Sequence, residues 1–454
     1  MLRKRKCTQL LLFILTGKSK YFNYLPTPKW SALNYLLFAV YFVVLCWLLL
    51  RIPFARNAGI DPAILLGLFC IKVLAGIAIG WIAIHIYGPG NDYWDNNDYA
   101  REEYQLLLTQ PGKYFTNLFT SDYEGGYGGL FNSFNSYWND LRSNIIVKLI
   151  SLFNIFSRGD YYINSLFFNF LVFFSHIILY RLFIKLFPKQ QWAVITGAFL
   201  LPSTLYFSSG MHKDGVVLVL LAMLVYSVYQ SLAKTKFNAR RIGIISVCML
   251  LLFFIRSFVF LALVPALFAW ILVAKTRWPA VRTFAAVYLL AGLLFFNVDA
   301  VVSEIKPMGI IIKKQTEYLE LTGAATSIQL TPLQPTFASF VRNAPEALGH
   351  SLLRPYIWEA PVLSLLPLCL ELLLYHLLLI LFIFYRKKEI AGGSRAFICF
   401  AVFFTLSVFL MIGYIVPNLG SLVRYRSLYL PLLITPLLCY IDWEKLVGVI
   451  KIKK

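Results

Sequence analysis

Apolar stretches of membrane-spanning length recur along the whole chain. They lie near residues 31–50, 63–87, 163–184, 191–207, 215–233, 242–255, 257–274, 281–298, 362–385, 396–416 and 427–441. A helix needs about 20 mainly apolar residues to cross the hydrocarbon core of a bilayer. The pattern therefore predicts an all-α polytopic membrane protein with about 11 transmembrane helices, in a range of about 10–12. Charged residues make up only 14% of the chain, against roughly 25% in soluble domains.

Residues 242–274 leave two alternatives open. Their apolar run is interrupted at Arg256 and Ser257, so it predicts either two short helices or one long helix. An arginine inside an apolar segment faces the bundle interior or water more often than lipid.

Two polar insertions divide the apolar segments, at residues 88–162 and 299–361. No internal repeat is visible. We therefore expect residues 1–454 to form a single transmembrane domain with these two insertions on one face.

Lys and Arg cluster in short connections between the apolar segments and at the end of the chain. These clusters lie at residues 51–56, 185–189, 234–241, 275–282, 386–395 and 445–454. The positive-inside rule places them in the cytoplasm, so both polar insertions fall on the extracytoplasmic side. The formal net charge of +21 is thus a sign of topology, and no nucleic-acid partner is expected. The compact loops fit a multi-pass protein of the bacterial cytoplasmic (inner) membrane.

The start of the chain conflicts with this topology. Eleven spans that end in the cytoplasm put the N-terminus outside, yet residues 1–30 carry basic side chains and no acid. Either Leu10–Leu15 belongs to an extra crossing, or residues 145–157 form a span and the acidic insertion is cytoplasmic. We favour the insertion outside because it is poor in Lys and Arg. The short apolar core before Thr16 does not predict a cleavable signal.

The first insertion is acidic in an otherwise basic chain. Asp92, Asp95 and Asp98 follow one another at three-residue intervals, so on a helix they share one face. Carboxylates placed just outside a membrane can act as the general base on a sugar hydroxyl, or can help to hold a divalent cation. The alternative is a solvated loop in which Asp and Asn only cap a helix.

A second candidate site is the turn between two apolar segments that contains His212, Lys213 and Asp214. The N-terminus of the following helix offers free N–H groups and a positive dipole end, to which Lys213 and His212 add charge and donors. This combination suits a phosphate or pyrophosphate. Alternatively, Asp214 caps the helix and Lys213 reaches the lipid headgroups.

Further arginines lie on the same predicted face. Arg354 and Glu359 are the first and last residues of the segment Arg-Pro-Tyr-Ile-Trp-Glu, which precedes the apolar run at 362. Arg424 and Arg426 precede the last apolar run. Arginines on this face favour anionic partners, either lipid headgroups or a lipid-linked phosphate. No two of the seven cysteines form a CxxC pair, so no zinc site or disulfide framework is predicted.

An acidic outer loop with basic groups on the same face suits transfer of a sugar from a polyprenyl-phosphate carrier. The chain resembles GT-C-type polytopic glycosyltransferases and the membrane proteins of bacterial surface-polysaccharide synthesis. The resemblance rests on the Asn91–Tyr99 loop, the Pro202–Asp214 turn, the Arg354–Glu359 segment and the terminal Arg-Tyr-Arg with Leu-Pro-Leu-Leu.

This resemblance implies a GT-C-like fold and a defined chemistry. The donor would be a sugar on a polyprenyl phosphate, and the acceptor a glycan or lipid outside the cytoplasm. By similarity, Asp92, Asp95 or Asp98 would be the base, and Lys213, Arg354, Arg424 or Arg426 would face phosphate. No cofactor is predicted with certainty; the only candidate is the divalent cation that these carboxylates could help to hold.

Two other functions remain open. A polymerase or ligase of lipid-linked oligosaccharide repeats would use the same face and carrier, but could depend on His212 and the arginines. A transporter or flippase would need a polar path, for which the sequence offers Lys72, His85, His176, Arg181, Arg256, Glu371 and His376. Long acidic outer loops favour the enzyme.

Overall fold

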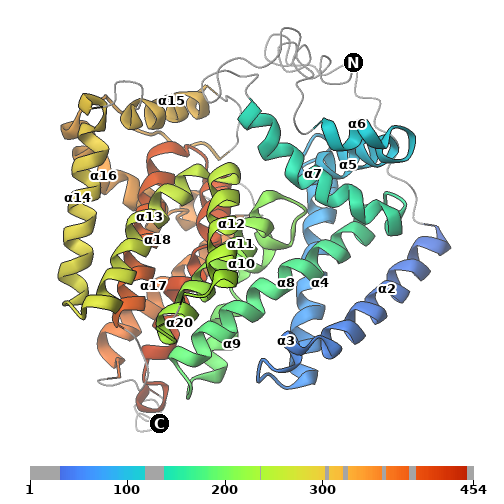
Figure 1. Cartoon of the computed structure of the whole chain (residues 1–454), viewed down its shortest axis with the longest axis horizontal. Coiled ribbons are helices and arrows are strands. Elements are labelled where there is room, and N and C mark those ends of the chain that lie inside the picture. Colours follow the sequence, from blue (N-terminus) through green and yellow to red (C-terminus); the bar gives the residue numbers. More distant parts are fainter. Residues whose placement is uncertain are drawn as a thin grey trace. The chain divides into compact units, whose positions relative to one another are not determined.

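The computed structural model describes residues 31–117, 137–235, 237–301, 306–320, 326–359, 365–387 and 395–446, except the side chains of 137–140, 142, 143 and 301. Within these ranges the regular structure is helical (Figure 1), and extended residues pair only in two isolated bridges. The predicted all-α class is thus confirmed for this part of the chain. The basic N-terminal residues 1–30 and the acids Asp122 and Glu124 lie outside it.

The chain divides into two compact units. Unit 1 comprises residues up to Phe173 together with Ser209–Gly215, and unit 2 comprises the remainder. Unit 1 contains α2 (Ala32–Arg51), α3 (Pro53–Arg56), α4 (Pro62–His85), α5 (Asp92–Thr109), α6 (Pro111–Thr116), α7 (Tyr137–Ser157) and the first part of α8 (Tyr161–Leu186).

Unit 2 contains the rest of α8 and the helices that follow. These are α9 (Gln191–Phe199), α10 (Pro202–Ser209), α11 (Lys213–Ala233), α12 (Ala239–Ile255), α13 (Ser257–Thr276), α14 (Ala280–Val301), α15 (Pro307–Leu319), α16 (Phe337–Leu353), the short 3-10 turn η1 (Ile357–Glu359), α17 (Leu366–Tyr385), α18 (Arg395–Ile415), α19 (Leu419–Ser427) and α20 (Leu430–Tyr440). Ser209, the last residue of α10, and residues 213–215 at the start of α11 belong to unit 1.

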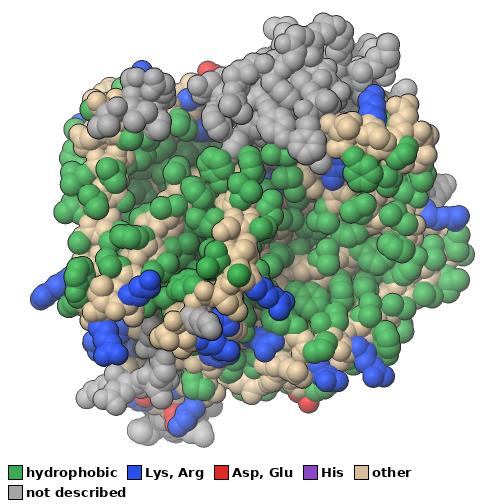
Figure 2. Space-filling view, viewed as in Figure 1, with side chains coloured by type: hydrophobic (Ala, Val, Ile, Leu, Met, Phe, Trp, Pro, Cys, Tyr) green, Lys and Arg blue, Asp and Glu red, His purple; other side chains and the backbone are tan. Residues whose placement is uncertain are grey.

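Eight of the described helices are long and apolar enough to cross a membrane: α2, α4, α8, α11, α13, α14, α17 and α18. Hydrophobic side chains cover much of the surface that Figure 2 shows, and Lys and Arg side chains are sparse among them. A multi-pass membrane protein is the architecture that these helices support. Few residues of α2, α14 and α17 are buried, so these helices present apolar surface to the surroundings.

The other three predicted spans are short or broken helices. The stretch 191–207 forms α9 and α10, which separate just before Pro202, and 427–441 falls on the end of α19 and on α20, whose second residue is Pro431. Proline has no N–H and disfavours a helical residue before it, so each break coincides with a proline. The stretch 242–255 forms α12, which ends at Arg256, where α13 begins. Of the two alternatives for 242–274, two helices are therefore correct.

Side-chain caps mark several helix starts that the sequence signals. An acceptor side chain takes a backbone N–H of the first turn at Ser31, Asp61, Asn91, Asn238, Thr336 and Asn418. Each satisfies a donor that the helix itself leaves without a partner.

Within unit 1, α4 and α8 pack closely through small residues. A Cβ at Gly76 would overlap the side chain of Asn169, and a Cβ at Gly80 would overlap the ring of Tyr161. Glycine is needed at both positions for the helices to approach this far. This contact holds the C-terminal half of α4, which leads into α5, against α8.

Within unit 2, α18 packs against α13, α14, α16 and α20. The second insertion therefore folds partly onto a candidate span: α16 crosses α18 so closely that a Cβ at Gly413 would overlap the carbonyl of Ala347. Ser351 Oγ donates to the Phe409 carbonyl at 2.6 Å, and the Tyr414 hydroxyl donates to the Phe340 carbonyl at 2.6 Å. These bonds connect the insertion to the helix bundle.

Candidate functional site

The three aspartates lie on the first two turns of α5. Asn91 caps this helix by accepting from the Trp94 N–H at 3.2 Å, and Asp92 and Asp95 lie in the first turn. Negative charge is favourable there because the helix dipole is positive at its N-terminus. The predicted helical spacing of Asp92, Asp95 and Asp98 is thus present.

His212 lies between two carboxylates in unit 1. Its Nδ1 is 3.1 Å from Asp214 Oδ2, and its Nε2 is 3.6 Å from Asp92 Oδ2. The side chains of Asp214 and His212 are 0% and 8% exposed, whereas that of Asp92 is 62% exposed. The row of groups therefore leads from a buried carboxylate through an imidazole to a carboxylate at the surface.

The turn that carries His212 is held against α5. Asn96 Nδ2 donates to the Met211 carbonyl at 3.1 Å, and the Tyr93 ring meets the His212 ring edge-on with centroids 6.1 Å apart. A Cβ at Gly210 would overlap the Tyr93 ring. Residues between the aspartates thus fix the distance from α5 to the imidazole.

Trp94 and Asn97, in the first two turns, anchor α5 to α4 and α8. Trp94 Nε1 donates to the Gly80 carbonyl at 2.9 Å, and the Trp94 ring stacks on Tyr161 at 4.1 Å. Asn97 accepts from Asn164 Nδ2 at 2.8 Å and is buried. Tryptophan and asparagine fix the helix, while Asp92 stays accessible.

Asp98 has a different environment from Asp92. It is 3.7 Å from Arg101, one turn further along α5. Burial raises the pKa of the Asp98 carboxyl above its ordinary value, and the nearby Arg101 offsets part of that rise. A raised pKa is what a general base near neutral pH needs, so Asp98 also stays a candidate.

Lys213 is the first residue of α11 and is half-buried, directly after His212 in the chain. Asp214 lies in the first turn of the same helix. Lys72 is also in unit 1 and is 0% exposed, unlike a snorkelling lysine, whose charged end stays in water. The hydroxyl of Ser209 donates to its carbonyl at 3.5 Å.

A carboxylate–imidazole–carboxylate row can move a proton. The buried acceptor Asp214 can hold the imidazole tautomer in which Nδ1 carries the proton, so that Nε2 faces Asp92. The 3.6 Å gap is longer than a hydrogen bond, and such contacts often shorten only when substrate binds. Among the described residues, no group of three His, Cys, Asp or Glu side chains is arranged to hold a metal ion.

The other predicted residues belong to unit 2. Arg354 Nε lies 3.3 Å from Glu359 Oε1, and Glu359 also accepts from the Tyr356 N–H at 3.1 Å. The Arg-Pro-Tyr-Ile-Trp-Glu segment is therefore closed on itself by its first and last residues. Both charged side chains remain partly exposed.

Arg426 is buried, and its guanidinium donates hydrogen bonds to backbone carbonyls. Its Nη1 donates to the Ser351 carbonyl at 2.9 Å and to the carbonyl of Arg354. Burial lowers the pKa of Arg426 to about 10, and Glu371 raises it in part, so the group is charged at neutral pH. This arginine connects α19 to the end of α16, and Arg424, two residues earlier, is half-buried.

Arg256 occupies the break between α12 and α13. Its guanidinium lies 4.2 Å from the Tyr425 ring centroid, and the Tyr425 hydroxyl is 3.0 Å from that of Tyr318. The Arg256 side chain thus faces the protein interior, in keeping with its 5% exposure.

Sequence reasoning missed a buried cluster around Glu371. Its carboxylate accepts from the Ser203 N–H at 3.0 and 3.1 Å, from the Ser203 hydroxyl at 3.0 Å, and from the Tyr375 hydroxyl. Glu371, on α17, therefore supplies the acceptor for a backbone N–H at the start of α10 that this helix cannot pair itself. The only signal in the sequence was an acid within an apolar run, together with a proline that opens a helix.

Comparison with known proteins adds no assignment. No family model matches the chain, and no curated protein or solved structure matches it. The chemistry of this protein must be judged from its own residues.

Proposed function

We propose that the protein is a membrane-embedded glycosyltransferase that moves a sugar from a polyprenyl-phosphate-linked donor to an acceptor outside the cytoplasm. The acceptor is a glycan or lipid in cell-surface glycan synthesis, and the site of action is the bacterial cytoplasmic membrane. The observation that carries this proposal is the accessible Asp92 carboxylate backed by His212 and Asp214. The eight long apolar helices are consistent with a lipid-linked substrate.

In the proposed reaction, Asp92 is the general base. Its carboxylate takes the proton of the acceptor hydroxyl as that oxygen attacks the anomeric carbon of the donor sugar. The bond between the anomeric carbon and the phosphate oxygen breaks, and polyprenyl phosphate leaves. His212 shares the proton with Asp92, and Asp214 stabilises the imidazolium that results.

The leaving phosphate needs positive charge. Lys213 and the N-terminal N–H groups of α11 are the proposed partners in unit 1. Arg354, Arg424 and Arg256 are proposed separately as anion-binding residues of unit 2, with Glu359 orienting Arg354 and Arg426 fixing the backbone around it.

Two alternatives have observations in their favour. If His212 itself is the base, a polymerase or ligase of lipid-linked repeat units would use the same buried imidazole between two carboxylates. The helix breaks at Pro202 and Arg256 are typical of transporters, where irregular backbone borders a substrate path.

Mass spectrometry of lipid-linked saccharides and surface glycan separates these functions. Cells that lack the protein should accumulate the donor and make a glycan shorter by one sugar. Accumulation of complete but unjoined repeat units would instead identify a polymerase or ligase. An unchanged glycan and carrier pool would contradict both enzymes.

A further inference from the structure

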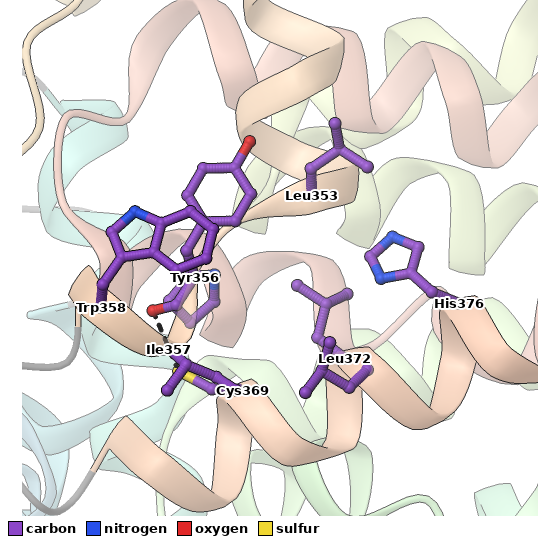
Figure 3. A pocket seen from close by; sticks show the side chains of 9 residues that line it. Leu353, Tyr356, Ile357, Trp358, Cys369, Leu372 and His376 are labelled. Atoms are coloured by element: carbon purple, nitrogen blue, oxygen red, sulfur yellow. Dashed lines mark hydrogen bonds between the residues drawn. The ribbon is translucent and has the colours of Figure 1, made fainter.

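A cleft of about 240 Å³ lies in unit 2 between the Arg354–Glu359 segment and α17. In Figure 3, Tyr356 and Trp358 lie at one end and His376 at the other, with Cys369 and Leu372 of α17 between them. Cys369 and Leu372 are buried, so they form the floor. The cleft extends along α17 from Cys369 to His376, seven residue steps or about 10 Å along a helix.

The lining is almost wholly apolar and its rim is exposed. Leu353, Ile357 and Leu373 are 43%, 47% and 48% exposed, and Trp358 is 82% exposed. The cleft therefore opens on the outer surface of α17, a candidate span of which few residues are buried. In a membrane this surface meets hydrocarbon chains.

The size of the cleft limits its occupant. Sites for whole drug-sized ligands have volumes of about 300–1,000 Å³, so this cleft holds part of a chain and no headgroup. A single hydrocarbon chain matches an apolar space of this volume and length.

The residues at the mouth of the cleft are of the types found at the headgroup level of a membrane. The Tyr356 and Trp358 rings are stacked at 4.8 Å with an angle of 13° between their planes, and amphipathic aromatic rings prefer the interface between lipid and water. Beside them, Arg354 and Glu359 form a partly exposed ion pair. One positive and one negative group complement the phosphate and ammonium of a zwitterionic headgroup.

We propose that this cleft binds one acyl chain of a zwitterionic phospholipid, with the headgroup beside Arg354 and Glu359. The bound chain packs between the Arg354–Glu359 segment and α17. The cleft belongs to unit 2, whereas Asp92 and His212 belong to unit 1, and this proposal does not depend on the proposed reaction. Arg354 and Glu359 are the residues that both proposals use.

Photolabelling tests the proposal without an activity readout. The full-length protein is placed in nanodiscs of anionic phosphatidylglycerol that contain a trace of phosphatidylethanolamine with a diazirine on its acyl chain, and labelled residues are mapped by mass spectrometry. We expect the label to concentrate in residues 353–358 and 369–376. Even labelling of the exposed apolar residues of α14 and α17 would overturn the proposal, because it would show only bulk lipid.

Paired variants sharpen the test. Leu373→Trp narrows the cleft from its rim, whereas Leu374→Trp adds the same bulk to an exposed neighbour outside the cleft. The first should abolish the preference for the cleft and the second should preserve it. Loss of the label in both variants, or competition by polyprenyl phosphate but not by unlabelled phosphatidylethanolamine, would contradict a phospholipid site.

Discussion

Asp92 Oδ2 lies 3.6 Å from Nε2 of His212, and this contact joins the start of α5 to the turn before α11. The imidazole is buried and the carboxylate is exposed, so an acceptor hydroxyl can reach Asp92 while His212 stays out of water. The proposed chemistry depends on this pair more than on any other.

Replacing Asp92 with Asn should reduce turnover by about 10²–10⁴-fold, the usual contribution of a general base. The fold should persist, because the side chain is exposed and nearly equal in size. Sugar transfer by the purified protein and its thermal melting measure the two effects. Glu102→Gln, an exposed acid on the same helix, is the matched control and should remain active; if Asp98→Asn inactivates the protein and Asp92→Asn does not, the base is Asp98.

His212→Gln should also impair turnover, and the effect should not add to that of Asp92→Asn. Groups that act as one unit lose their joint contribution when either is removed. Rates of the two single variants and the double variant give the comparison. Independent, multiplying losses would mean that His212 and Asp92 act in different steps.

The carboxylate of Glu371 should be more important for stability than for turnover. In Glu371→Ala the Ser203 N–H and hydroxyl lose their acceptor, and each buried donor without a partner costs about 1–3 kcal/mol. Glu371→Gln keeps an acceptor oxygen and should be less destabilising. Thermal unfolding in detergent ranks the variants, and equal stability of Glu371→Ala and the wild type would refute the capping role.

Gly413→Ala should destabilise unit 2 by about 1–3 kcal/mol, the usual cost of overpacking. The added methyl group would meet the Ala347 carbonyl and push α16 away from α18. Gly292→Ala is the control, because a Cβ on that residue of α14 meets nothing within 4 Å. Comparable melting temperatures for the two variants would show that α16 does not need this close approach.

Stability should fall as the solution is acidified, partly through His350. Burial lowers its pKa, Arg354 lowers it further, and Glu346 and Glu359 oppose the shift. A histidine with a lowered pKa contributes stability above its ordinary pKa of about 6.5, and that contribution is lost as the pH falls towards the folded value. Thermal melts near neutral pH and about one to two pH units lower should differ less in His350→Gln than in the wild type. An unchanged difference would exclude His350 as a source.

Local patterns in the sequence predicted much of this architecture. Apolar length located the long spans. Arg256 marked the interruption at which α12 ends and α13 begins, with one long helix left as the alternative, and the three-residue spacing of Asp92, Asp95 and Asp98 fitted one face of a helix. These features depend on residues close together in the chain. The spans near Pro202 and Pro431 came out shorter than expected because proline interrupts them.

Contacts between distant segments could not be predicted in the same way. Nothing in the spacing of the chain connects Glu371 to Ser203, or Asp92 to His212, because periodicity describes one helix at a time. The two-sided environment of His212 and the close approach at Gly413 therefore required coordinates.

The Glu371 cap has a consequence for the order of biosynthesis. Its two partners are separated by 168 residues, which a ribosome that adds about 5–20 residues per second needs roughly 8–34 s to translate. During that interval the start of α10 has no carboxylate acceptor from α17. The N–H and hydroxyl of Ser203 therefore need another acceptor, such as water, until α17 has been made.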